Sequence, residues 1–142
     1  MSAYDQANVF AKILRGEMQA TKLYEDERTF AFMDIMPRAD GHTLVIPKAP
    51  IRTLLDAGPD DLAAVYATVQ KVARAALAGM AADGLTIQQF NEPAGGQVVF
   101  HMHVHVLPRW DGVALRPHTG EMARGDVLAG HAAKIRATLD RG

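Results

Sequence analysis

Three histidines at alternate positions are the residues with the most evident chemistry in this sequence. His101, His103 and His105 lie in the segment HMHVHVLPR and are three of the six histidines among 142 residues. Side chains alternate between the faces of a strand, so an extended backbone places all three imidazoles on one face, roughly 6.5–7 Å apart. The residues between and after them point to the opposite face, which we expect to face the core: Met102, Val104 and Val106.

The histidine row is open to three interpretations. In the first, the histidines are structural, since a lone strand histidine is usually a surface or hydrogen-bonded residue. We do not expect three on one face, opposite an apolar face, all to be satisfied core groups. A metal site is the second, because imidazole is the commonest metal ligand, although no carboxylate lies close in sequence. The third is covalent catalysis, in which one neutral imidazole attacks an electrophile while its neighbours hold the other charge state.

A glycine pair, Gly95 and Gly96, precedes the row and favours the third interpretation. Glycines let backbone N–H groups approach an anion closely, as in phosphate cradles. A glycine pair alone is more often only a turn. Beside three histidines, it indicates a site for an anionic group.

The elements that must position these residues are short strands and a few helices. The spacing of apolar residues predicts helices at Asn8–Leu14, Asp60–Met80 and Asp126–Leu139, with Pro59 before the long one. Strands are predicted at Thr21–Glu25, Thr29–Asp34, His42–Ile46, Leu85–Phe90 and Val98–Leu107, the last stopped by Pro108. This order predicts an α+β fold: an antiparallel sheet of about five strands, a long central helix and short terminal helices.

Length and composition narrow the class of protein further. The 142 residues predict one domain, and a net charge of −1 with 22% charged residues offers no basic face for nucleic acid. A small molecule is therefore the expected partner. The chain has no cysteine, which excludes disulfides, thiolate metal ligands and a cysteine nucleophile. With no signal-peptide pattern and no apolar run of about 18 residues, we expect a cytoplasmic protein without membrane contact.

The histidine row and its surroundings resemble a known family. HMHVHV matches the H-x-H-x-H signature of the histidine-triad (HIT) nucleotide hydrolases and transferases, and GGQVVFHMHVHVLPR is similar to that family's core. Upstream, the segments NVFAKILRGE, YEDERTFAFMDIMPRADGHTLVIPK and TIQQFNEPAGG resemble its earlier blocks. The resemblance covers residues 8–109 and implies a single HIT-like domain over 1–142. The tail and helix at 110–142 resemble bacterial members described as diadenosine tetraphosphate hydrolases.

The resemblance implies a catalytic role for five residues. His103 would attack the α-phosphorus of a nucleoside 5′-phosphate derivative, with its other ring nitrogen donating to the backbone carbonyl of His101. His105 would contact the phosphate oxygens and the leaving group. Gln97 would lie beside the phosphate or leaving group, and His42 would pack behind the triad.

The resemblance also implies a nucleotide-binding set. Asp34 would accept from the ribose hydroxyls, and Asn91 would reach the ribose–phosphate portion, although Asp34 alone could be a plain turn residue. Gly96 and Val98 would lie near the phosphate, and Val98 stands where relatives often have a serine or threonine. The base pocket would be apolar and is as consistent with ordinary core: Phe10, Ile13, Phe32 and Ile35.

No metal or other cofactor is expected. One bacterial branch of the family holds a structural zinc with two cysteines, a later histidine and a triad histidine. The matching non-triad positions here are Asn8, Ala11 and Pro50, so all those ligands are missing together.

The sequence thus predicts an enzyme that hydrolyses a P–O or P–N bond at the α-phosphate of dinucleoside polyphosphates or nucleoside phosphoramidates, through a covalent nucleotidyl-histidine. The rival interpretation is a nucleotide-binding module, a sensor or interaction protein with little catalysis. The expected ligand is a purine nucleotide, with adenosine favoured, and the resemblance implies a homodimer. Trp110 and Arg116–Met122 either line the leaving-group side or form a surface loop.

Overall fold

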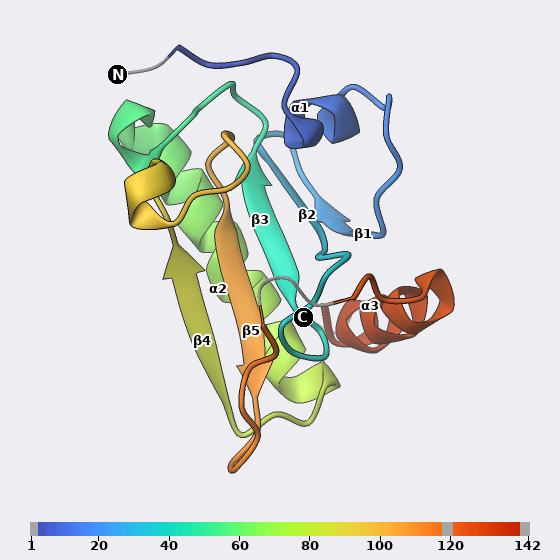
Figure 1. The fold of residues 1–142 in the computed structure, drawn as a ribbon. Helices are drawn as coiled ribbons and strands as arrows, with labels where there is room; N and C mark the ends of the chain where they lie inside the picture. Colours follow the sequence, from blue (N-terminus) through green and yellow to red (C-terminus); the bar gives the residue numbers. More distant parts are fainter. Residues whose placement is uncertain (1–2, 118–120, 140–142) are drawn as a thin grey trace.

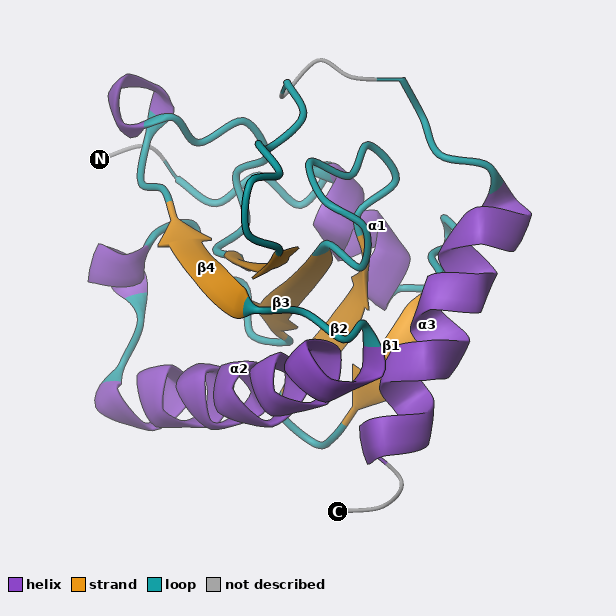
Figure 2. Ribbon diagram, turned by 90° about the horizontal axis from the view of Figure 1, so that it is seen from below, coloured by secondary structure: helices purple, strands orange, loops and turns teal. Residues whose placement is uncertain are grey.

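The chain forms a five-stranded antiparallel sheet with helices on both faces (Figures 1 and 2). The computed structural model describes residues 3–117 and 121–139. The sheet order is β1-β2-β3-β5-β4, so the central strand β3 pairs with β5, which comes from a distant part of the sequence. The strands are β1 (Lys22–Glu25), β2 (Thr29–Met33), β3 (Thr43–Pro47), β4 (Gly84–Gln89) and β5 (Val104–Arg109).

One face of the sheet is covered by the long helix α2 (Pro59–Gly79), as Figure 2 shows. Pro59 occupies the first turn, where its missing N–H costs nothing, and two aspartates there favour the positive end of the helix dipole. Between helix and sheet lies the main core, which includes Val65, Val69 and Val72 of α2. The sheet contributes Met33, Val45, Val104 and Val106, and Met102 joins them just before β5. The predicted core-facing side of the histidine segment is therefore confirmed.

The opposite face carries the short helix α1 (Val9–Leu14) and a smaller core. Asn8 caps α1, because its side-chain oxygen accepts from the Ala11 N–H at 2.9 Å. The buried residues of this smaller core are Phe10, Phe32, Leu44 and Ile46. Leu44 pairs with His105 in the β3–β5 register, so the histidines share this face of the sheet.

The predicted long strand Val98–Leu107 is wrong at both ends. β5 begins at Val104, because the Met102 N–H donates to the Ile51 carbonyl, in a loop outside the sheet. β5 also continues through Pro108, which pairs with Leu85 of β4. A proline is tolerated there because β3 starts opposite Val106, so no β3 residue requires the missing N–H.

The remaining elements close the ends of the sheet. Short 3₁₀ turns occur at η1 (Leu54–Asp56) and η2 (Pro93–Gly95). The helix α3 (Gly125–Leu139) packs on α2 and beside β1, where Arg136 donates to the Lys22 carbonyl. Thus α3 covers the β1 edge, while β4 forms the other edge of the sheet (Figure 1).

None of the helices in residues 3–117 and 121–139 combines the length and apolar character needed to cross a membrane.

Candidate active site

His103 is held in one tautomer by the backbone beside it. Its Nδ1 lies 2.7 Å from the carbonyl oxygen of His101, which can only accept, so Nδ1 carries the ring proton and Nε2 keeps the lone pair. The ring packs edge-on against Phe10, with centroids 4.9 Å apart. Burial lowers the pKa of His103 below its ordinary value of 6.5, although the hydrogen bond to His101 opposes this. A buried, neutral imidazole with an exposed lone pair is a potential nucleophile.

His101 is bonded at both ring nitrogens. Its Nε2 donates to the Pro47 carbonyl at 2.8 Å, and its Nδ1 accepts from the Tyr4 hydroxyl at 2.6 Å. The ring is fully buried, and this burial lowers the pKa of His101 to about 4, opposed by the hydrogen bond to the Pro47 carbonyl and reinforced by His103. His101 is thus a neutral structural group whose carbonyl orients His103, and no lone pair of its ring remains for a metal ion.

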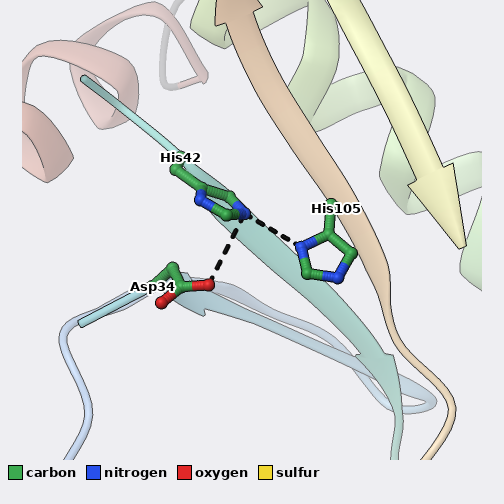
Figure 3. Close-up of side chains that lie close together, drawn as sticks. All are labelled: Asp34, His42 and His105. Carbon is green, nitrogen blue, oxygen red and sulfur yellow. Dashed lines mark hydrogen bonds and ion pairs between the residues drawn. The ribbon is translucent and has the colours of Figure 1, made fainter. Parts of the chain in front are cut away.

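His105, His42 and Asp34 form a connected chain (Figure 3). The backbone N–H of Arg38 donates to His42 Nδ1 at 3.1 Å, so the proton of neutral His42 is on Nε2. That Nε2 lies 2.9 Å from His105 Nδ1 and 3.5 Å from Asp34 Oδ2. Because His105 Nδ1 accepts from His42, the ring proton of His105 is on Nε2. His105 is therefore set up to donate a proton.

The same three side chains have possible metal-ligand atoms within 4.8 Å of one another. A metal bound at His42 Nε2 would move the ring proton to Nδ1, where the Arg38 N–H already donates. The two donors would then face each other across 3.1 Å. The arrangement of Asp34, His42 and His105 therefore fits a proton-transfer chain better than a metal centre.

All three triad histidines are buried and each is hydrogen-bonded, but His103 is bonded only through Nδ1 and keeps the lone pair of Nε2, so the three are not all satisfied core groups. Backbone carbonyls, Tyr4 and His42 supply the partners, and Tyr4 and His42 are far from the row in sequence. Two of the three histidines, His103 and His105, nevertheless line a cavity.

The cavity has a volume of about 510 Å³ and lies between α1, the loop after β2 and the segment before β5. It contains most of the predicted nucleotide-binding residues, namely Phe10, Ile13, Phe32, Asp34, Ile35, Gly96 and Val98. Its wall is mainly apolar, and Asp34 is the only acidic residue among the described residues that line it. Apolar walls with a few polar groups are typical of pockets that bind a flat organic ring.

The backbone conformation at position 96, in the cavity wall, requires a glycine. Its φ is +96°, and a Cβ there would lie 3.3 Å from the Phe90 ring. Any larger residue would therefore be strained and would press on Phe90. The Phe90 ring packs against the His105 ring, with centroids 5.4 Å apart. Val98, by contrast, is 75% exposed at the cavity wall and supplies no hydroxyl.

Gln97 and Asn91 lie outside the cavity lining. The Gln97 amide accepts from the Glu92 N–H at 2.7 Å and donates to the carbonyls of Arg52 and Val99. The Asn91 side chain accepts from the Leu54 N–H and exchanges hydrogen bonds with Gln89. In this structure both amides brace loops beside the site, and their contacts to substrate stay predictions.

Several residues of the site carry no signal in the sequence. Tyr4 meets His101 across 97 positions, and Arg38 acts through its backbone alone. Phe90, next to Asn91, is the one of this pair that lines the cavity. Trp110 lines a different, shallow hollow at the far end of β4 and β5, and its ring N–H donates to the Ala81 carbonyl.

Comparison with known proteins places this chain in one family. A HIT domain model matches residues 15–112. The adenylylsulfatase HINT3 of Arabidopsis thaliana is 37% identical over 78% of this chain, which spans 59% of that protein's length. An uncharacterised HIT-like protein of Mycobacterium tuberculosis is 43% identical over 83% of this chain and 82% of its own. The chain therefore belongs to the HIT domain family, whose members are generally nucleotide hydrolases and transferases.

Solved structures agree with this assignment. A Hit-like protein from Bartonella henselae is 47% identical, with a TM-score of 0.92 over 96% of this chain and 99% of that one. A zinc-bound histidine triad family protein from Mycobacterium smegmatis is 36% identical, with a TM-score of 0.83 over 96% and 95% of the two chains. A histidine triad nucleotide-binding protein from Candida albicans is 29% identical, with a TM-score of 0.70 over 95% and 99%. The predicted HIT-like α+β fold is confirmed.

Proposed function

We propose that this protein transfers the nucleotidyl group of a nucleoside 5′-phosphate derivative to His103 and then to water. The observation that carries the proposal is the hydrogen bond from His103 Nδ1 to the His101 carbonyl, in a side chain that lines the cavity. His103 Nε2 would attack the α-phosphorus, so that a P–N bond forms as the bond to the leaving group breaks. The product of this step is a nucleotidyl-histidine.

His105 would supply the proton that the leaving group needs. Its Nε2–H would pass to the departing oxygen or nitrogen, and a proton from solvent would replace it, so that His105 and His42 both stay neutral and His42 keeps its hydrogen bond to His105 Nδ1. In the second step, water attacks the phosphorus, the P–N bond breaks, and the proton that water loses is released to solvent, which balances the proton taken up in the first step. Nucleotide and free His103 are released, and no metal or cofactor enters either step.

The cavity supports binding of a nucleoside next to the histidines. Phe10 and Phe32, which pack edge to face with centroids 5.3 Å apart, form an apolar wall for a base. A carboxylate can accept several hydrogen bonds, so Asp34 would accept from the ribose hydroxyls in addition to its contacts with the Met36 N–H and His42 Nε2. We propose an adenine nucleotide as the ligand.

Trapping the covalent intermediate tests this proposal. The protein is mixed with adenosine 5′-phosphoramidate, quenched within the first turnover in cold alkaline denaturant, in which a histidine P–N bond survives, and weighed intact. We expect the mass of one adenylyl group on the wild-type chain and none on His103→Ala, whose turnover should fall by on the order of ten-thousandfold. His131→Ala, in α3 and outside the cavity lining, should retain the adduct and full turnover.

The same experiment distinguishes this enzyme from the rival function, a nucleotide-binding module. Nucleotide binding by wild-type protein without adduct or product would instead favour a binding module, for which the missing hydroxyl at Val98 is the motivating observation. Turnover that survives His103→Ala would overturn the nucleophile assignment.

The leaving group is decided by a panel of substrates. Diadenosine tetraphosphate, diadenosine triphosphate and adenosine 5′-phosphoramidate compare the P–O and P–N bonds. The name of the Arabidopsis relative, an adenylylsulfatase, adds adenylyl sulfate to the panel. The largest kcat/KM identifies the preferred leaving group.

We also propose that two copies associate through the β4 edge. The β1 edge is covered by α3, whereas β4 ends the sheet with Ile87 43% exposed. An open edge with apolar side chains favours pairing with another strand. Sedimentation at micromolar concentration should give a dimer, and Ile87→Lys should give monomers. A monomeric wild-type protein would exclude this assembly.

A further inference from the structure

The loop from residue 35 to residue 40 directs its amides toward the site. The Met36 N–H donates to Asp34 Oδ1 at 2.8 Å, and the Arg38 N–H donates to His42 Nδ1 at 3.1 Å. The first bond fixes the carboxylate that faces the cavity. The second fixes the His42 tautomer that lets its Nε2 donate to His105. Two backbone amides of one short loop therefore orient both polar partners of the triad.

The carbonyls of the same loop are bound by the segment between β5 and α3. The Arg116 N–H donates to the Arg38 carbonyl at 2.7 Å, and Arg116 Nε donates to the Pro37 carbonyl at 3.1 Å. The Ala123 N–H donates to the Ile35 carbonyl at 2.8 Å. Three carbonyls of the loop are thus hydrogen-bonded to this segment, while two of its amides are hydrogen-bonded to Asp34 and His42.

Arg116 makes the most extensive of these contacts. Its own carbonyl accepts from Arg38 Nε at 2.9 Å, so the two residues exchange hydrogen bonds across 78 positions of sequence. Its guanidinium also pairs with Asp40 at 3.0 Å, where both side chains are about half exposed. The guanidinium therefore bridges the Pro37 carbonyl and Asp40, one on each side of Arg38.

We propose that Arg116 is a positioning residue that sets the protonation pattern of His42 and His105 through the backbone of Arg38. This inference rests on the proposed function for the role of His105 as proton donor. If the loop relaxes, the Arg38 N–H moves away from His42 Nδ1, and the proton of His42 is free to occupy Nδ1. His42 Nε2 then accepts and no longer donates to His105 Nδ1, so His105 Nε2–H is no longer the favoured form.

The first experiment measures the tautomers directly and needs no turnover. Long-range ¹⁵N–¹H NMR spectra of the histidine rings distinguish a proton on Nδ1 from one on Nε2. We expect Nε2–H for both His42 and His105 in the wild-type protein, and mixed tautomers of both in Arg116→Ala. Arg116→Lys should be intermediate, because one ammonium group cannot reach the Pro37 carbonyl and Asp40 together. Arg124→Ala, which removes an exposed pair with Asp126 in the same tail, should match wild type.

The second experiment uses the leaving group. An amine must be protonated as it departs, whereas p-nitrophenolate leaves without a proton. Arg116→Ala should lower kcat for adenosine 5′-phosphoramidate by about tenfold or more, and kcat for the p-nitrophenyl ester of AMP by less than about twofold. A merely structural role would lower both rates together.

The outcomes separate this inference from the proposed function. Wild-type tautomers in Arg116→Ala would overturn the positioning role, whatever the activity. Equal loss with both leaving groups would overturn it as well. If no substrate forms an adduct, the proposed function fails, but mixed tautomers in Arg116→Ala would still support the control of His42 by Arg116.

Discussion

The proton positions of four histidines follow from groups that can act in only one way. Backbone carbonyls only accept and backbone N–H groups only donate, so Pro47, His101 and Arg38 assign the tautomers of His101, His103 and His42. His105 then follows from His42. The three rings therefore differ in role: His101 is hydrogen-bonded to the backbone, His103 presents a lone pair and His105 presents a proton.

The buried position of His103 predicts activity under mild acid. Protonation of Nε2 abolishes the nucleophile, and because burial lowers the pKa of His103, the neutral form persists below pH 6.5. Single-turnover adduct formation, measured between about pH 5 and 8, should stay constant down through pH 6.5 and decline only below it. A half-maximal rate at or above pH 6.5 would contradict this prediction.

Tyr4 should contribute to stability through one hydrogen bond. Tyr4→Phe leaves the buried Nδ1 of His101 without its donor, so we expect the free energy of unfolding to fall by about 1–3 kcal/mol in urea titrations. Tyr66→Phe, at an exposed position of α2, should change it by less than about 0.5 kcal/mol. Equal effects of the two substitutions would mean that the Tyr4–His101 bond adds nothing in solution.

At the scale of elements, the site lies where α1 packs on the sheet face opposite α2. α1 has only six residues and depends on Asn8 to satisfy its first turn. Its Phe10 lies against both Phe32 of β2 and His103. The order of α1 is thus coupled to the shape of the base wall.

Removing the α1 cap should therefore affect binding more than chemistry. Asn8→Ala should lower the free energy of unfolding by about 1 kcal/mol and raise KM severalfold, with kcat nearly unchanged. Asn8→Asp keeps the acceptor for the Ala11 N–H but loses the Nδ2 hydrogen bond to the Asp5 carbonyl, so it should lose less stability and affinity than Asn8→Ala. Steady-state kinetics and urea titrations check both, and a fall in kcat with constant KM would contradict the expected role.

At the scale of the whole molecule, burial of the triad links stability to pH. The folded pKa of His101 is about 4, whereas an unfolded histidine titrates near 6.5. The unfolded chain therefore binds more protons between these values, and stability present above pH 6.5 is lost as the pH falls toward 4. The loss from this group amounts to about 3 kcal/mol.

Urea titrations at several pH values check this prediction. The free energy of unfolding of the wild-type protein should decline from pH 6.5 downward. His101→Gln removes the titrating group and should show a shallower decline over the same interval. Identical pH dependence in both proteins would show that His101 does not control it.

Most of the fold was predictable because its signals are local. Apolar spacing, Pro59 and the two aspartates that follow it predict α2 to within one residue at each end. The start of β5 was not predictable from residues 98–103, since the strand is limited by a bond from Met102 to Ile51. Strand ends depend on partners that the local sequence does not contain.

The candidate site likewise has a part that the sequence predicts and a part that only the tertiary structure decides. The types and alternation of His101, His103 and His105, with the resemblance they carry, predict the chemistry from the sequence alone, although only His105 lies in β5 and the other two precede it. The tertiary structure alone decides which proton each ring holds. Those bonds come from Tyr4, Pro47 and Arg38, which are brought to the row only by the packing of distant segments. A hydrogen bond across tens of residues leaves no pattern in one sequence, since any residue can supply a backbone amide or carbonyl.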